Sequence, residues 1–358
     1  MLNPELVLVH AGGETFGGWE SAQVTASIKE ASRTFKLETT ERPGQFKFPP
    51  GTPISITANG DLLCDGYVNE YEPSGDAESH KICITGRSGS QDVVDCAADT
   101  DSGEWDNADP EQVFQDLAKP YGVQVQAKVA LQKVPRWSIA PGETVHQNIS
   151  RLIRPQGVST MGNADGSIDL TNAQAAQYHY GMLAEGWNIK KYSGLLSDQG
   201  RFKNYKVRGQ RRLGSTANDL HIEESDTDQG GNRARTKIVI NETDTDPKRA
   251  RARASHEKER AAGNAVSCSI TTQGFRDFGG KLFCPNHIIY VHAPVLLHIT
   301  QSMLIESLVF KQDAKKGSDC EIRLVDPRAH KGQAGGGEKS PEGKDLGGDT
   351  DPAWKKGF

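Results

Sequence analysis

The chain has 358 residues, a length that usually makes about two to four domains. Its hydrophobic content of 35%, with 38 Gly and 17 Pro, indicates several small cores, because it is low for one compact enzyme and too high for a disordered chain. The net charge of −5 excludes a surface built throughout to bind nucleic acid. No apolar run reaches the ~18 residues of a membrane span, and the first residues lack a secretion signal, so we expect folding in the cytoplasm without membrane insertion.

Residues 1–95 have the pattern of a small antiparallel β-barrel. Apolar and polar residues alternate at 54–58, Asn59 and Gly60 provide a two-residue turn, and a second strand follows at 62–64. Further strand-like runs, separated by Gly-rich or Pro-rich turns, are expected at residues 6–10, 23–28, 34–39 and 81–85. Many short strands without a helical period favour a barrel or sandwich.

Residues 96–178 combine helices and strands and predict a small α+β domain. Asp109 precedes Pro110 and an apolar helical face, which indicates a capped helix with proline in its first turn. Thr144 caps a second predicted helix, which must end near Pro155. A strand is expected at 167–171.

Strand patterns return after residue 178, and we assign residues 179–212 and 265–328 to a second β-barrel. Its expected strands are residues 188–192, 204–208, 266–271, 287–292, 303–310 and 320–325. Residues 205–210 echo residues 82–87, since each run ends a strand with Gly and a long polar residue, and the echo suggests two related barrels. The fold class is therefore α+β, mainly β.

Residues 213–264 are predicted to be an insertion. Residues 219–232 are acidic and Gly-rich and are interpreted as a loop, residues 237–240 as a strand, and Asp246 with Pro247 as the start of a helix that continues to residue 262. The basic residues of this helix are scattered around it, which favours a solvated helix with ion pairs over a helix that binds a polyanion: Arg249, Arg251, Arg253, Lys258 and Arg260. Residues 329–358 are expected to be a flexible Gly-rich tail, disordered or folded on a partner.

The common catalytic motifs are missing from the sequence. Gly12 and Gly17 have the spacing of a phosphate-binding loop, but Gly18 and Trp19 replace the required Lys and Ser or Thr, so we interpret the segment as a turn. No GxSxG, HExxH or CxxC pair occurs. The six cysteines are expected to be buried thiols, with disulfides formed in an oxidising exterior as the alternative that the sequence leaves open: Cys64, Cys83, Cys96, Cys268, Cys284 and Cys320.

Three clusters of polar residues are candidate sites. His287, His292 and His298 could share a zinc ion only if Pro294 made a turn between them, because a strand would separate them. The densest carboxylates lie in the predicted acidic loop and lack the rigid separation that a hydrolase needs: Glu223, Glu224, Asp226 and Asp228.

The third cluster is a basic region with interleaved aromatic residues. It suits either a nucleic-acid strand or, as we favour, the outer face of a sheet with cross-strand pairs: Lys190, Lys191, Arg201, Lys203, Lys206, Arg208, Arg211 and Arg212, with Tyr192, Phe202 and Tyr205. Taken with the other clusters, the sequence predicts no catalytic, cofactor-binding or metal-binding residues, and no enzyme.

Several segments, in order along the chain, resemble the Mu-like baseplate hub proteins of contractile phage tails. The most specific is a strand with Gly86 and Arg87 that leads into the Asp-rich residues 92–97. The similarity spans about residues 5–328, and its other segments are residues 16–28, 35–38, 65–68, 140–145, 201–210 and 324–327. The role of the tail after Pro327 is not supplied by this resemblance.

The resemblance implies a homotrimeric ring with two β-barrels per subunit. Such a ring has pseudo-sixfold symmetry and adapts a hexameric tail tube, or its distal tube protein, to a trimeric central spike. Implied further are contacts with other baseplate proteins and a channel through which DNA passes without specific binding. The protein would be assembled in the host cytoplasm and reside in the virion.

A DNA channel should lack a dense basic lining, so we predict that Arg251 and Arg253 face away from its axis. Two alternative functions stay open, a tail-associated cell-wall hydrolase and a nucleic-acid-binding module.

Overall fold

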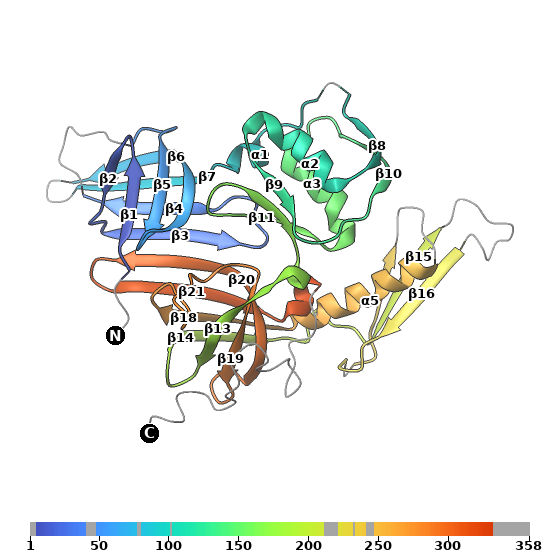
Figure 1. The fold of residues 1–358 in the computed structure, drawn as a ribbon. Helices are drawn as coiled ribbons and strands as arrows, with labels where there is room; N and C mark the ends of the chain where they lie inside the picture. The colour runs from blue at the N-terminus through green and yellow to red at the C-terminus, as the bar shows by residue number, and fades with distance from the viewer. Residues whose placement is uncertain are drawn as a thin grey trace.

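The computed structural model describes residues 5–40, 48–76, 80–100, 102–210, 221–231, 233–240 and 247–331. Figure 1 shows three parts: a large β-structure, a smaller part with helices α1–α3 above it, and an arm that extends to the right. The expected flexible tail of residues 329–358 is corrected at its start, because Ala329 and His330 belong to a 3-10 helix and Ala329 is buried. The rest of the tail from residue 332 onward, Asp246, Arg211 and Arg212 lie outside the described residues.

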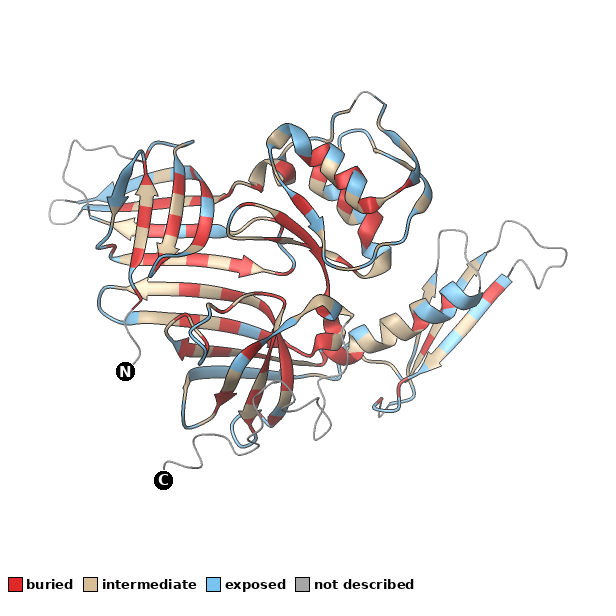
Figure 2. Cartoon of the chain, in the orientation of Figure 1, coloured by how far each residue is buried: buried red, intermediate tan, exposed pale blue. Residues whose placement is uncertain are grey.

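The N-terminal half of the large sheet contains seven antiparallel strands. They are β1 (Val7–Ala11), β2 (Glu14–Phe16), β3 (Ser21–Ser27), β4 (Thr34–Thr39), β5 (Pro53–Ala58), β6 (Asp61–Gly75) and β7 (His80–Ser88). Their spatial order is β3-β4-β7-β6-β5-β1-β2. Buried residues alternate with less buried ones along β3 and β5, as expected for a sheet with one face on a core (Figure 2).

The C-terminal half of the large sheet has six strands in the order β13-β19-β20-β21-β18-β14. They are β13 (Gln177–Ala184), β14 (Ile189–Leu196), β18 (Val266–Gln273), β19 (His287–Ala293), β20 (Ile299–Asp313) and β21 (Gly317–Val325), followed by the 3-10 helix η4 (Pro327–His330). The pair β13–β19 is parallel, and the other pairs are antiparallel.

The two halves are one continuous sheet, because β3 pairs with β20. Seven residue pairs join them, from Ser21 opposite Asp313 to Ser27 opposite Ser307. One hydrophobic core extends through both halves. The mainly β, α+β class is thus confirmed, whereas the strand pairs of the described residues form an open path and do not close two separate barrels. A side-chain contact also joins β20 to the start of the chain: Gln312 accepts a hydrogen bond from Val7 N over 3.3 Å and donates one to Glu5 O.

The α+β part packs helices against short strands. Its elements are α1 (Gln91–Asp95), β8 (Glu104–Ala108), α2 (Pro110–Ala118), η1 (Lys119–Tyr121), β9 (Val125–Ala127), β10 (Val134–Ser138), α3 (Val145–Ile153), η2 (Arg154–Gln156), β11 (Ser159–Gly162), β12 (Ile168–Thr171) and η3 (Ala173–Ala175). Both predicted caps are confirmed: Asp109 accepts from Glu111 N, and Thr144 forms a capping box with Gln147. The core of this part includes Phe114 and Ile149.

The arm is a three-stranded sheet covered on one face by a helix. Its order is β16 (His221–Thr227), β15 (Asn204–Gln210), β17 (Thr236–Ile240), and the helix is α5 (Pro247–Asn264). Val207, Ile222, Ala250 and Ala254 form its small core.

Two expectations are corrected in the arm. Residues 204–210 belong to the arm sheet and not to the second half of the large sheet, so their echo of residues 82–87 does not mark a related barrel. Residues 221–227 are strand β16 and not a loop. Their polar sequence lacks the apolar alternation of a strand, but pairing with β15 satisfies their backbone hydrogen bonds. Within the described ranges, no helix combines the length and apolar character needed to cross a membrane.

Candidate functional site

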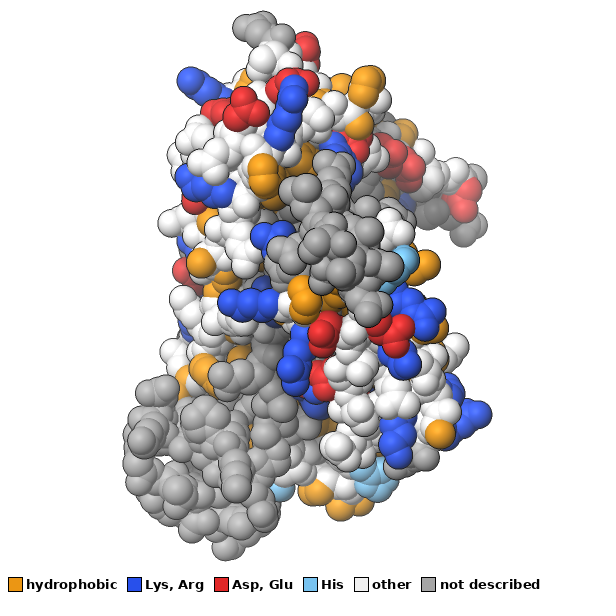
Figure 3. All heavy atoms as spheres, turned by 90° about the vertical axis from the view of Figure 1, so that its right-hand side faces the viewer, with side chains coloured by type: hydrophobic (Ala, Val, Ile, Leu, Met, Phe, Trp, Pro, Cys, Tyr) orange, Lys and Arg blue, Asp and Glu red, His pale blue; other side chains and the backbone are white. Residues whose placement is uncertain are grey.

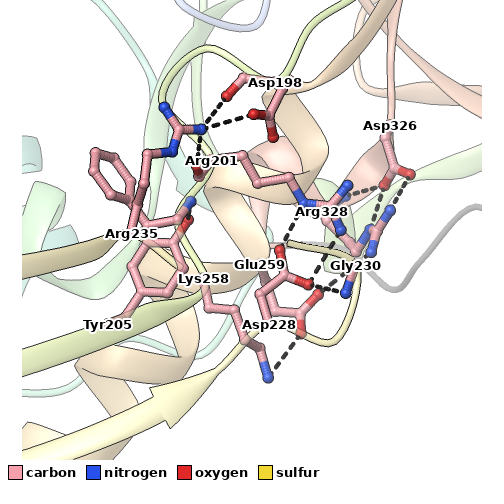
Figure 4. Close-up of polar contacts among 11 residues, drawn as sticks. Asp198, Arg201, Tyr205, Asp228, Gly230, Arg235, Lys258, Glu259, Asp326 and Arg328 are labelled. Atoms are coloured by element: carbon pink, nitrogen blue, oxygen red, sulfur yellow. Dashed lines mark hydrogen bonds and ion pairs between the residues drawn. The ribbon is translucent and has the colours of Figure 1, made fainter. Parts of the chain in front are cut away.

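A network of ion pairs lies where the arm joins the large sheet (Figure 4). Asp228, after β16, accepts hydrogen bonds from Arg201 Nε at 2.6 Å, from Arg201 Nη2 at 3.1 Å and from Gly230 N at 2.9 Å. The bond from Arg201 is the main reason that the pKa of Asp228 lies below its ordinary value. The carboxylate is therefore ionised at neutral pH and holds the loop after β16 to residue 201.

Arg328 connects this network to the end of the large sheet. It donates to both oxygens of Asp326, at 3.0 and 2.9 Å, and its Nη1 lies 3.8 Å from Glu259 of α5. Beside it, Gly263 of α5 lies so close to η4 that a Cβ would be 2.1 Å from Ala329 N. The arm is thus fixed to the large sheet both by ion pairs of Arg328 and by the close approach of α5 to η4.

The predicted acidic cluster lies along β16 and directly after it, where Glu223, Asp226 and Asp228 form ion pairs. Glu223 is paired with Lys206 at 3.2 Å and with Arg208 at 2.7 Å, both on β15. Asp226 is paired with Lys258 of α5 at 3.0 Å. Since these carboxylates are matched by cations across a sheet or a helix, the arrangement is that of structural ion pairs and not of a hydrolase pair.

The basic region is divided between two sheets. Lys190, on β14, is paired with Asp319, whereas Lys206 and Arg208 form the cross-strand pairs with Glu223 that the sequence predicted. In the view from the arm side, blue Lys and Arg side chains are interspersed with red Asp and Glu side chains (Figure 3). The interpretation as an outer sheet face with cross-strand pairs is confirmed for these residues.

Helix α5 packs on the arm sheet with small side chains and forms ion pairs with charged ones. Ala250 and Ala254 pack on the arm sheet, while Glu257 and Lys258 form ion pairs with Lys237 at 2.9 Å and with Asp226. Arg251 is exposed. The prediction of a helix with ion pairs is confirmed, and its orientation in an assembly stays a prediction.

The three predicted histidines do not form a common site. His287 and His292 lie on β19, and His298 follows a turn at residues 294–297. Among the residues that the structure describes, no group of three His, Cys, Asp or Glu side chains is placed to hold a metal ion. Gly12 and Gly13, with φ of 58° and 82°, form the turn between β1 and β2, as expected for a turn and not a phosphate loop.

A buried cluster around His179 was missed by the sequence analysis. Asp277 Oδ2 lies 2.8 Å from His179 Nδ1, and His179 Nε2 accepts a hydrogen bond from Cys284 N at 3.2 Å. The Cys284 thiol donates to Leu282 O instead of to the histidine, and burial raises its pKa. Because His179 Nε2 is occupied by a backbone N–H, the geometry opposes an activated thiol nucleophile. The six cysteines are free thiols in this structure.

The outer face of the large sheet is hollowed at the junction of its two halves. The hollow has a volume of about 430 Å³, and its lining comes from β3, β14, β18, β20 and β21. Hydroxyl and amide side chains alternate there with three lysines and three carboxylates: Ser21, Gln23, Lys191, Tyr192, Ser193, Ser269, Thr271, Lys311, Gln312, Asp313, Lys316, Asp319 and Glu321. This face is polar and nearly neutral.

Two family models match adjacent parts of the chain. The model described as "Mu phage baseplate assembly protein GpP-like, N-terminal" matches residues 6–88, and "Baseplate hub protein gp44-like, second domain" matches residues 90–172. These ranges coincide with the N-terminal half of the large sheet and with most of the α+β part.

Relatives extend the similarity over most of the chain. The baseplate hub protein gp44 of Escherichia phage Mu is 27% identical over 89% of this chain and 87% of that protein. The 43 kDa tail protein of prophage MuSo2 from Shewanella oneidensis is 27% identical, with a TM-score of 0.82 over 91% of this chain and 99% of that chain. A component of the type VI secretion system of E. coli shares the fold at 9% identity and a TM-score of 0.58, covering 88% of this chain and 76% of that one. By these matches the chain is similar, over most of its length, to the baseplate hub and tail proteins of Mu-like phages.

Proposed function

We propose that three copies of this baseplate hub protein form a ring that adapts the hexameric tail tube to a trimeric central spike. The ring would also form part of the channel for DNA and would act by symmetry and not by catalysis. Its partners would be the tube or distal tube protein, the spike and other baseplate proteins, with assembly in the host cytoplasm.

The observation that carries the proposal is the pairing of β3 with β20. It places two sheet halves, of seven and six strands, side by side in one chain. Three chains would then present six halves, which a sixfold tube can contact almost equivalently at one end while the threefold axis is kept for the spike.

The hollowed outer face of the large sheet is the surface that we propose for the channel lining. Lys311 and Glu321 are paired across it at 2.7 Å, and Lys190 is paired with Asp319 at its margin. A lining whose cations are matched by carboxylates would let DNA pass without condensing on it, since nonspecific affinity for DNA comes from unmatched Lys and Arg. Arg251 and Arg253 of α5 are predicted to face away from this channel.

The domain division follows from the same architecture. We propose the N-terminal half of the large sheet, the α+β part and the C-terminal half as units, with the arm inserted after residue 203. The tail after residue 331 has no role assigned in this proposal.

The test is the mass of the protein in solution, measured alone and with the tube and spike proteins. We expect a particle of three times 38.9 kDa that binds both partners. A strict monomer that binds neither would contradict the proposal. Salt-dependent binding of duplex DNA would favour the nucleic-acid-binding alternative, and release of fragments from cell-wall polymer would favour the hydrolase.

A further inference from the structure

Six large apolar side chains are exposed at the end of the C-terminal half of the large sheet. We call them the β13 patch: Tyr178, Tyr180, Trp187, Phe278, Val295 and Leu296. Their exposed fractions lie between 43% for Leu296 and 74% for Val295. They come from β13 and the turn after it, from the loop between β18 and β19, and from the turn between β19 and β20.

Direct contacts join these three segments into one surface. The rings of Trp187 and Phe278 are stacked, with centroids 4.5 Å apart and an angle of 14° between the planes. Phe278 also covers Gly181, where a Cβ would lie 2.3 Å from its ring. The Glu185 carboxylate accepts hydrogen bonds from Val295 N at 3.2 Å and from Leu296 N at 2.9 Å. It therefore fixes the turn between β19 and β20 beside the turn that follows β13.

The β13 patch is held in shape by a buried carboxylate beneath it. Asp277 Oδ2 accepts from Tyr180 N at 3.1 Å, and Oδ1 accepts from Gly279 N at 2.9 Å and from Lys281 N at 3.0 Å. Both carboxylates next to the patch, Glu185 and Asp277, are thus bound to backbone N–H groups. The surface is preorganised and apolar, which lowers the entropic cost of covering it.

The size of the β13 patch indicates what covers it. An aromatic side chain buries ~150–250 Å², so six large side chains that are about half exposed offer on the order of 500 Å². That is the greater part of the ~800 Å² that one partner contributes to a stable protein interface. Interfaces between copies of one chain are more apolar than transient ones, and this patch has four aromatic residues and two aliphatic ones.

We propose that the β13 patch is covered by a second copy of this chain. The inference rests on the proposed trimer and names one of its contact surfaces. Because a threefold ring joins unlike surfaces head to tail, the β13 patch of one copy contacts a different surface of the next.

The test measures the mass of the particle in solution for two variants in the β13 patch and one control outside it. Val295→Arg and Tyr178→Asp each place a charge in the patch. Ile240→Arg is the matched control, because Ile240 lies on β17 of the arm and is 71% exposed against 74% for Val295. We expect at least tenfold weaker self-association for the two patch variants and a trimer for the control, with an unchanged melting temperature of the monomer in each.

Hydroxyl-radical footprinting gives a residue-level readout with the full chain and with a chain that ends at Lys331. Oxidation of Trp187 and Phe278 should fall in the trimer relative to the dissociated chain, with or without residues 332–358. A wild-type trimer that Val295→Arg and Tyr178→Asp leave intact overturns this inference while the proposed ring stands. Equal dissociation by Ile240→Arg, protection only by the spike or tube protein, or protection that needs residues 332–358 also overturns it. A wild-type monomer refutes the ring itself.

Discussion

Arg276 Nε donates a hydrogen bond to Glu5 Oε1 at 3.1 Å, although the two residues are 271 positions apart in the chain. Arg276 also donates to Ala58 O at 3.0 Å, whereas the next residue, Asp277, accepts from His179 and Tyr180 of β13. The loop between β18 and β19 therefore ties the N-terminal half of the large sheet to the far edge of the C-terminal half.

Replacement of Arg276 with Ala should destabilise the large sheet. Glu5 is only 5% exposed, so the variant leaves a buried carboxylate without its cation, at a cost of about 2 kcal/mol. The measurement is the thermal midpoint followed by calorimetry. Arg136→Ala, which removes an exposed ion pair with Glu104, is the control and should leave the midpoint unchanged. Equal shifts of the thermal midpoint in the two variants would show that the Arg276 contacts stabilise the protein no more than an exposed ion pair does.

Gly263→Ala should destabilise the protein, although the same change in an exposed helix interior stabilises by ~1 kcal/mol. The reason is the 2.1 Å distance from the added Cβ to Ala329 N, which forces α5 away from η4. The thermal midpoint checks the sign of the effect. A higher midpoint for the variant would mean that α5 is not held against η4.

Asp228→Asn should loosen the arm without affecting the large sheet. The change removes the charge that both Arg201 nitrogens contact, and hydrogen exchange measured by mass spectrometry should rise in β15–β17 and α5 only. Glu223→Gln is the control, because it alters an ion pair on the exposed face of the arm sheet and leaves its junction with the body intact. Faster exchange in β3 or β20 would contradict the local role of Asp228.

Stability should fall as the pH decreases from about 6.5 to about 4. Burial, reinforced by the nearby His179 and Lys281 and opposed by Asp277, lowers the pKa of His287 to about 4, and burial lowers the pKa of His179 as well. Below pH 6.5 the unfolded chain binds protons that the folded chain does not, so the stability present above that pH is lost. His287→Gln should flatten the decline of the thermal midpoint over this range.

A second titration is expected at lower pH. The pKa of Glu306 is lowered to about 2, because its bonds with His330 and Lys29 outweigh the effect of burial, and its contribution is lost as the pH falls from 4.5 towards 2. The His287→Gln variant should keep this second decline. An unchanged profile between pH 6.5 and 4 in that variant would show that His287 is not responsible for the first.

Thiol labelling of the native protein should divide five of the six cysteines into two groups. Cys64, Cys268 and Cys320 are buried, and burial raises the pKa of Cys64 and of Cys268 to about 12. They should react only after denaturation, whereas the partly exposed Cys83 and Cys96 should react in the native state. Rapid labelling of Cys320 in the native protein would contradict the burial of β21.

Local features were predictable from the sequence, and long-range pairings were not. Thr144 and Asp109 carry their own capping signals, so their helices could be placed within a residue or two. The run from His221 to Thr227 has a single buried residue, Ile222, so only its neighbour β15 makes it a strand. The periodicity of apolar residues predicted individual strands and helices, but it did not predict which strands pair.

The junction of the halves and the histidine cluster depend on residues far apart in the chain. β3 pairs with a strand almost 300 positions later, and His179 meets Asp277 across 98 positions. A single His and a single Asp without a motif give no spacing signal. The echo of residues 82–87 at 205–210 misled for a related reason, because short strands that end in Gly are common and do not specify a partner.

Strand β20 pairs with β3, β19 and β21, so it is structurally part of both halves at once. A load applied along the strands would strain the backbone hydrogen bonds between β3 and β20 together, in shear. A load applied across the sheet would instead open them one after another. The chain should therefore resist sliding of its two halves much better than it resists their being peeled apart.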